Sequence, residues 1–156
     1  MGLGGNVGDV RAAITAAIGA IDAVPGVSVG ACSSLWRSAP VDADGDDFLN
    51  AVVEVTTTLE PEALLQQLHR IEAEAGRQRP YRHAPRTLDL DLLMVGQRCI
   101  DTPSLQLPHP RLHERAFVLL PLLELDPAVV HPRLGPLTAF VSAVADQVVS
   151  KLMPLD

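Results

Sequence analysis

The chain has 156 residues, of which 47% are hydrophobic, and its formal net charge is −7 at pH 7. This apolar content predicts a folded protein with one sizeable core and excludes intrinsic disorder. The acidic balance argues against a general nucleic-acid binder, which would present a basic face, and no apolar run is long enough to span a bilayer. We therefore expect one domain over residues 1–156, located in the cytoplasm, without nucleic-acid or membrane partners.

The N-terminal quarter of the chain predicts a strand, a helix and a second strand. Residues 1–3 have the pattern of a strand end that enters a glycine-rich turn. Asp9 is placed to cap a helix over residues 10–24, because a short side-chain oxygen before an apolar repeat accepts the free amides of the first turn. Residues 27–37 then predict a strand.

The next segment predicts a loop, another strand and another helix. An acidic stretch over residues 38–47 is too polar to pack and predicts a loop. Residues 48–59 form a second β-rich run. Pro61 is a favourable first helical residue, and Gly76 is a suitable stop for the helix that follows.

The arginine-rich segment over residues 77–93 is the most informative part of the sequence. Five of the twelve lysine and arginine residues fall between Arg70 and Arg86, and four of these lie in the predicted loop: Arg77, Arg79, Arg82 and Arg86. Directly behind the loop, Asp89 and Asp91 interrupt an apolar run. Aspartate is depleted in strands, so a strand that keeps two of them indicates a function.

The spacing of Asp89 and Asp91 predicts a site for a divalent cation. Side chains alternate along a strand, so both carboxylates point to one face, roughly 7 Å apart, while the intervening leucines point to the other. Two such carboxylates repel each other unless a cation lies between them. Mg²⁺ is commonly held by one or two carboxylates together with substrate phosphates. The arginines suit those phosphates, so the segment predicts a metal-assisted nucleotide site.

A solvated strand face is the alternative interpretation of the Asp-Leu-Asp triplet. It is favoured when the triplet is considered alone, since a charge run is usually exposed to solvent. The neighbouring arginines argue against it because the two charge signs are segregated along the chain rather than mixed. Cations for phosphate oxygens and carboxylates for Mg²⁺ together match the needs of phosphoryl-type transfer.

The order of elements is β-α-β-β-α-β. This order predicts an α+β fold with a ferredoxin-like βαββαβ core, in which two helices cover one face of an antiparallel sheet. The C-terminal third is predicted to add a short β segment and two helices, over residues 114–125 and 137–152. A plain strand-to-helix turn explains the N-terminal glycines without any ligand.

Residues 82–93 closely resemble the signature of the 6-hydroxymethyl-7,8-dihydropterin pyrophosphokinase family of folate biosynthesis. The resemblance extends along nearly the whole chain. Further segments that match family motifs are Gly2–Asn6, Phe48–Val52, Ile71–Glu72, Gly76–Arg79, Leu107–Pro110 and Arg115–Leu122. The family fold is ferredoxin-like, in agreement with the order of elements above.

The resemblance implies a reaction and its catalytic residues. Members of the family transfer a pyrophosphoryl group from ATP to the hydroxymethyl oxygen of the pterin and release AMP. Asp89 and Asp91 would bind two Mg²⁺ ions that bridge the triphosphate, and two-metal clamping of attacking and leaving oxygens supplies the physical reason. Arg77 and Arg86 would steady the phosphates through the transition state. Dihydropteroate synthase is the functional neighbour that the resemblance implies.

The resemblance also implies two sets of binding residues. The set for ATP comprises Glu72, Arg77, Arg79, Arg82, Arg86, His109 and Arg115. The set for the pterin comprises Ser38, Val41, Phe48, Asn50 and Phe117. Phe48 and Phe117 would stack on the two faces of the flat ring, and Asn50 has both the donor and the acceptor needed to bind an amide-like edge.

Two other functions remain open from the residues alone. A non-catalytic pterin- or nucleotide-binding module would keep the same pocket without turnover. A plain Mg²⁺-dependent nucleotide hydrolase would need no pterin pocket. Sequence reasoning without the resemblance reaches a Mg²⁺-nucleotide site beside an apolar aromatic pocket, and both alternatives share that site.

Overall fold

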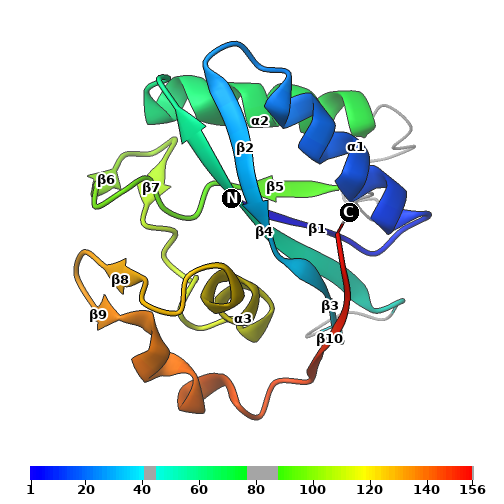
Figure 1. Ribbon diagram of the computed structural model, residues 1–156, viewed down its shortest axis with the longest axis vertical. Coiled ribbons are helices and arrows are strands. Elements are labelled where there is room, and N and C mark those ends of the chain that lie inside the picture. The colour runs from blue at the N-terminus through cyan, green and yellow to red at the C-terminus, as the bar shows by residue number, and fades with distance from the viewer. Residues whose placement is uncertain (41–44, 77–87, 156) are drawn as a thin grey trace.

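The structure is a computed structural model that describes residues 1–40, 45–76 and 88–155 (Figure 1). The first part of the chain contains β1 (Gly2–Gly5), α1 (Val10–Asp22), β2 (Val27–Cys32), β3 (Ser34–Ser38), β4 (Phe48–Thr57) and α2 (Pro61–Ala75). The second part contains β5 (Asp89–Asp91), β6 (Ile100–Asp101), β7 (Gln106–Leu107), α3 (Ala116–Leu125), β8 (Val130–His131), β9 (Gly135–Pro136), the 3-10 helices η1 (Leu137–Phe140) and η2 (Ser142–Val144), and β10 (Val149–Pro154).

One antiparallel sheet forms the centre of the molecule. Its strands follow the order β10-β3-β4-β1-β5, and β2 also pairs with β4. Figure 1 shows α1 and α2 together on one side of this sheet and α3 on the other. The described residues therefore form an α+β fold. No helix among them is long and apolar enough to cross a membrane.

Two apolar clusters hold the layers together. The first lies between the sheet and the helices α1 and α2, where Ile14, Leu64 and Leu90 are at most 3% exposed. The second lies under α3, where Leu112 and Leu119 are fully buried. Burial of a leucine or isoleucine side chain contributes about 1.5–3 kcal/mol, so the two clusters fix the sheet between its helices.

The predicted helices α1 and α2 are confirmed with small shifts at their ends. Asp9 caps α1, and its Oδ1 accepts a hydrogen bond of 3.0 Å from the amide of Ala12. The helix ends at Asp22, two residues before the predicted end. Pro61 is the first residue of α2, and Gly76 follows its last residue, as predicted.

The predicted strand over residues 27–37 is two strands, divided at Ser33. The buried Ser33 hydroxyl accepts a hydrogen bond of 2.9 Å from the amide of Val52 and donates one of 2.8 Å to the carbonyl of Ser34. The register of β2 on β4 shifts between Val29 and Cys32. A hydroxyl thus replaces one step of the backbone ladder, and the chain bends there without an unpaired buried amide.

The predicted C-terminal helix over residues 137–152 is wrong. Two short 3-10 helices occupy residues 137–144, and the chain then continues as β10. This strand pairs with β3, where Val149 faces Ser38 and Lys151 faces Trp36. Valine is β-branched and favours strands, and β3 offers an otherwise unpaired edge that the predicted helix would have left open.

A buried histidine in the C-terminal layer predicts that the stability of the fold depends on pH. His131 is 7% exposed, and its Nδ1 accepts hydrogen bonds of 3.1 Å from the amides of Arg133 and Leu134. Burial lowers the pKa of His131, and the nearby His113 and Arg133 lower it further. The unfolded chain therefore binds a proton at this histidine at a higher pH than the folded chain does.

We expect the free energy of unfolding to fall as the pH drops below about 6.5, the usual pKa of histidine. In His131→Asn, Oδ1 takes the place of Nδ1 as acceptor and no proton binds there. This variant should lose less unfolding free energy than the wild type between pH 7.5 and pH 5, as measured by urea titration at both values. An unchanged pH dependence would show that His131 is not the group responsible.

Candidate functional site

A cavity of about 530 Å³ opens between the sheet and the N-terminal end of α3. The sequence-predicted residues that line it are Ser38, Phe48, Asn50, Asp89, Asp91, Arg115 and Phe117. They come from β3, β4, β5 and α3, except Arg115, which directly precedes α3. Segments far apart in the sequence therefore meet here. Glu72 and His109 do not line the cavity. The other predicted residues (Val41, Arg77, Arg79, Arg82 and Arg86) lie outside the described residues.

Glycines face the two aspartates across the strand pair. β1 pairs with β5 in the register Gly2 to Asp91 and Gly4 to Asp89. Residues directly opposite each other share a sheet face, so β1 places no Cβ atom opposite either aspartate. On the opposite face Leu90 is 3% exposed. The alternation of acid and leucine predicted this division, whereas the period-two spacing of the two glycines is a signal that the sequence analysis missed.

Glu72 contacts the strand that carries the aspartates. Its Oε1 accepts a hydrogen bond of 2.6 Å from the amide of Leu90, the residue between Asp89 and Asp91. Burial raises the pKa of Glu72, and the two nearby aspartates raise it further, although the hydrogen bond from Leu90 acts in the opposite direction. A side chain from α2 thereby satisfies a backbone donor at the edge of the sheet.

Asn50 lies at the floor of the cavity and is 5% exposed. Its Nδ2 donates a hydrogen bond of 2.9 Å to Ser38 Oγ. A Cβ atom on Gly4 would lie 2.9 Å from Asn50 Oδ1, closer than such contacts allow. The absence of a side chain at Gly4 therefore gives the Asn50 amide its space in the cavity.

Aromatic and cationic side chains form another part of the wall. Phe48 and Phe117 are both half-buried, and the Arg115 Cζ atom lies 5.7 Å from the centroid of the Phe117 ring. This distance is typical of a cation–π contact. Burial and the charge of Arg111 lower the pKa of Arg115, and Asp91 acts in the opposite direction.

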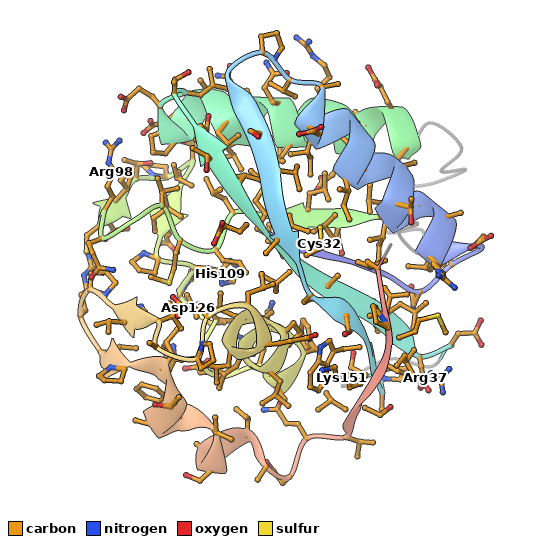
Figure 2. The ribbon with its side chains drawn as sticks, in the orientation of Figure 1. Cys32, Arg37, Arg98, His109, Asp126 and Lys151 are labelled. Carbon is orange, nitrogen blue, oxygen red and sulfur yellow. The ribbon has the colours of Figure 1, made fainter. Side chains whose placement is uncertain are left out.

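His109 lies between the β6–β7 hairpin and α3 (Figure 2). Its Nδ1 accepts a hydrogen bond of 3.1 Å from the amide of Arg111. Burial lowers the pKa of His109, and Arg115 and Arg111 lower it too, whereas Asp91 raises it. The same electrostatic neighbours act on Arg115, so His109 belongs to the charged surroundings of the cavity without lining it.

Three polar side chains that the sequence did not predict for the site also line the cavity: Arg111, Glu114 and Gln147. Arg111 and Glu114 form an ion pair, with 3.7 Å between Nε and Oε2. Both lie just before α3, between the matched segments Leu107–Pro110 and Arg115–Leu122. Gln147 lies 32 positions beyond Arg115, and nothing in its local sequence indicates the cavity.

The donor set of the cavity suits a hard divalent cation only in part. Asp89 and Asp91 supply carboxylate oxygens from one sheet face, which is the chemistry that Mg²⁺ prefers. Among residues 1–40, 45–76 and 88–155, no group of three or more acidic, histidine or cysteine side chains could hold a metal ion. A cation at the aspartate pair would therefore need oxygens from a substrate as well, and triphosphates provide them.

Comparison with known proteins identifies a family. Residues 1–127 match the family model of the 7,8-dihydro-6-hydroxymethylpterin-pyrophosphokinases. A 2-amino-4-hydroxy-6-hydroxymethyldihydropteridine pyrophosphokinase from Synechocystis is 42% identical over 135 residues, which cover 86% of this chain and 69% of that protein. A protein of the same name from Haemophilus influenzae is 38% identical over 153 residues, covering 97% of this chain and 96% of that protein.

A longer relative contains the same unit. A folic acid synthesis protein from Pneumocystis carinii is 38% identical over 154 residues, which cover 97% of this chain and 21% of that protein. The matched unit thus occurs both in a protein of similar length and as a minor part of a longer chain.

Proposed function

The chain belongs to the 7,8-dihydro-6-hydroxymethylpterin-pyrophosphokinase family, and from this premise we propose that it transfers the pyrophosphoryl group of ATP to the hydroxymethyl oxygen of 6-hydroxymethyl-7,8-dihydropterin. The observation that carries the proposal is the cavity, in which two carboxylates from β5 lie with two aromatic rings and a buried amide. A nucleotide hydrolase would not need the aromatic rings and the amide.

The proposed reaction exchanges one bond to phosphorus for another. The hydroxymethyl oxygen forms a bond to the β-phosphorus of ATP and loses its proton. The bond between that phosphorus and the oxygen bridging it to the α-phosphorus breaks. AMP leaves with the bridging oxygen, and the pterin carries the diphosphate. Such transfer depends mainly on positioning and on stabilisation of charge.

Asp89 and Asp91 are the proposed ligands of two Mg²⁺ ions. Support comes from their shared sheet face, their place in the cavity wall and the facing glycines, which leave room beside the carboxylates. When bound, the ions would supply positive charge that stabilises the phosphate, attacking and leaving oxygens. Glu72 holds the amide of Leu90 and so steadies the strand between the two ligands.

Among the described residues of the proposed nucleotide set, Arg115 lines the cavity. Its guanidinium group suits phosphate oxygens because it presents a planar fork of donors. Glu72 and His109 belong to the same proposed set. The charge of Asp91 acts on the pKa of both residues. Arg77, Arg79, Arg82 and Arg86 complete it, with Arg77 and Arg86 proposed to act in the transition state.

The proposed pterin subsite consists of Phe48, Phe117, Asn50, Ser38 and Val41. Two half-buried rings in one cavity offer offset stacking to a flat heterocycle. The Asn50 Nδ2 donates hydrogen bonds to Ser38 Oγ at 2.9 Å and to the carbonyl of Trp36 at 3.5 Å, so its carbonyl oxygen is the group that remains for a ligand.

The proposal also includes the fold type, the domain organisation, the location and the functional neighbour. The core is of the ferredoxin-like βαββαβ type, which the strand order β2/β3-β4-β1-β5 and the helices α1 and α2 on one face support. Residues 1–156 form one domain that acts in the cytoplasm on small molecules. Dihydropteroate synthase is the proposed functional neighbour.

Gly4→Ala tests whether the Asn50 amide forms a hydrogen bond with the pterin. The new Cβ would displace Asn50 Oδ1, so one hydrogen bond worth about 1 kcal/mol is lost. We expect the KM for the pterin to rise roughly fivefold, with a smaller change in the KM for ATP, in steady-state assays that vary each substrate.

Gly2→Ala is the matched control on the same strand. Its Cβ would meet the Leu93 side chain at 3.5 Å, an ordinary contact distance, so we expect a clearly smaller change in the pterin KM. Equal effects of the two variants would contradict the role of Gly4 and Asn50.

Product analysis tests the reaction type. With Mg²⁺-ATP and the reduced pterin, we expect AMP and pterin diphosphate in equal amounts, resolved by anion-exchange chromatography. ADP as the product would contradict pyrophosphoryl transfer. ATP consumption that does not depend on the pterin would indicate a hydrolase, and ligand binding by calorimetry without turnover would indicate a binding module.

A further inference from the structure

Helix α3 begins without a cap of its own. Arg115 occupies the N-cap position, and its side chain makes no capping hydrogen bond. The preferred residues there are serine, threonine, aspartate and asparagine, whose short side chains accept the free amides of the first turn. An arginine has only donors and cannot replace them.

A residue far along the chain supplies the missing acceptor. Gln147 Oε1 accepts a hydrogen bond of 2.8 Å from the amide of Ala116, the first residue of α3. Gln147 Nε2 donates one of 2.8 Å to the carbonyl of Glu114. A single side-chain amide thus binds the peptide groups on both sides of Arg115.

The position of Arg115 explains why the cap comes from elsewhere. Its side chain lines the cavity and lies against the Phe117 ring. Serine or aspartate at this position would cap the helix but would remove the cation from the cavity. The two requirements compete for one position, and the chain satisfies both because Gln147 caps the helix.

Gln147 is itself held on both sides. Its backbone amide donates a hydrogen bond of 3.1 Å to the carbonyl of Val144. Two residues later the chain enters β10, where Val149 faces Ser38 in the register with β3. Gln147 therefore connects the cavity wall that contains Ser38 with the wall that contains Arg115. Of the described residues beyond α3, it alone lines this cavity.

We propose that Gln147 is a positioning residue for the reaction: as a remote cap of α3, it fixes Arg115 and Phe117 in the cavity wall. The inference rests on the proposed function of the cavity. It concerns a residue outside the segment 1–127 that matches the family model.

Gln147→Met is the decisive variant because methionine has similar length and lacks both hydrogen-bonding groups. We expect its KM values for ATP and the pterin to rise several-fold, with a smaller change in kcat, at a temperature where circular dichroism shows the chain fully folded. Gln147→Glu keeps the acceptor for Ala116 and adds a charge that favours a helix N-terminus, so it should recover part of the loss.

Gln97→Met is the matched control for loss of a bridging glutamine. Gln97 Nε2 donates a hydrogen bond of 2.9 Å to the carbonyl of Val130, across the same sequence separation of 33 residues, and does not line the cavity. A merely structural role for Gln147 predicts that both variants lose some stability and keep wild-type KM values. KM values for Gln147→Met equal to those for Gln97→Met would overturn the proposal.

A double-mutant cycle tests whether Gln147 acts through its neighbour. Combined with Arg115→Ala, Gln147→Met should reduce kcat/KM for ATP by clearly less than the product of the two single effects. Full additivity would overturn the proposal. Amide exchange of Ala116 gives a readout that needs no turnover: in Gln147→Met we expect faster exchange, and unchanged exchange would overturn the cap. If the wild type produced no AMP, the proposed function would fail while this readout still tested Gln147.

Discussion

Replacing Asp91 by asparagine is expected to lower kcat by at least about 100-fold, the usual effect of removing one electrostatic contact that stabilises a transition state. The substitution keeps the shape of the side chain and removes its charge, so the anionic ligand for a divalent cation becomes a weaker, neutral one while β5 stays intact. We also expect the variant to need a higher Mg²⁺ concentration for half-maximal activity. Initial rates measured across a Mg²⁺ titration report both effects.

Asp101→Asn provides the matched control for Asp91→Asn. Asp101 is an exposed strand aspartate on β6 that does not line the cavity, and its Oδ1 accepts a hydrogen bond of 3.3 Å from Gln106 Nε2. Its substitution should leave kcat and the Mg²⁺ dependence unchanged. A near-normal rate for Asp91→Asn, with both variants folded, would refute the assignment of Asp91 to the metal.

Phe117→Ala is expected to raise the KM for the pterin roughly tenfold or more. Loss of the ring removes both apolar contact area and an offset-stacking interaction, which is worth about 0.5–1.5 kcal/mol by itself. Phe117→Leu should recover part of the loss because it restores apolar volume without a π face. Steady-state kinetics with the pterin varied at saturating ATP measure the effect.

Phe140→Ala separates stacking from general destabilisation. Phe140 is half-buried in η1, where its ring lies 5.1 Å from that of His113 in an edge-on contact, and it does not line the cavity. We expect this control to lower the thermal unfolding midpoint and to leave the pterin KM unchanged. A pterin KM that is the same in Phe117→Ala and the wild type would contradict the pterin subsite.

Local signals made much of the fold predictable. Asp9 marks the start of α1, and Pro61 and Gly76 delimit α2, because capping chemistry depends on a few adjacent residues. The alternation of aspartates and leucines in β5 set which side chains are buried. These features need no knowledge of distant segments, and the structure bears them out.

The features that were missed depend on contacts between distant segments. β10 is a strand because β3 offers it an edge, and Ser33 divides β2 from β3 because its hydroxyl pairs with Val52. Gln147 lines the cavity only through contacts with Glu114 and Ala116. No local pattern encodes such pairings. The site residues themselves were predicted through the family resemblance and the charge pattern, and their roles stay predictions.

The role of Asp89 and Asp91 as metal ligands is tested most directly by locating the divalent ions in a complex with the nucleotide. Crystals grown with Mn²⁺, the pterin and an ATP analogue whose α–β bridge is a non-cleavable methylene group would hold the complex before the bond breaks. We expect two anomalous peaks for manganese, each coordinated by a carboxylate oxygen of Asp89 or Asp91 and by phosphate oxygens. Manganese bound to the nucleotide alone, with both carboxylates turned away from it, would contradict the assignment of Asp89 and Asp91 as metal ligands.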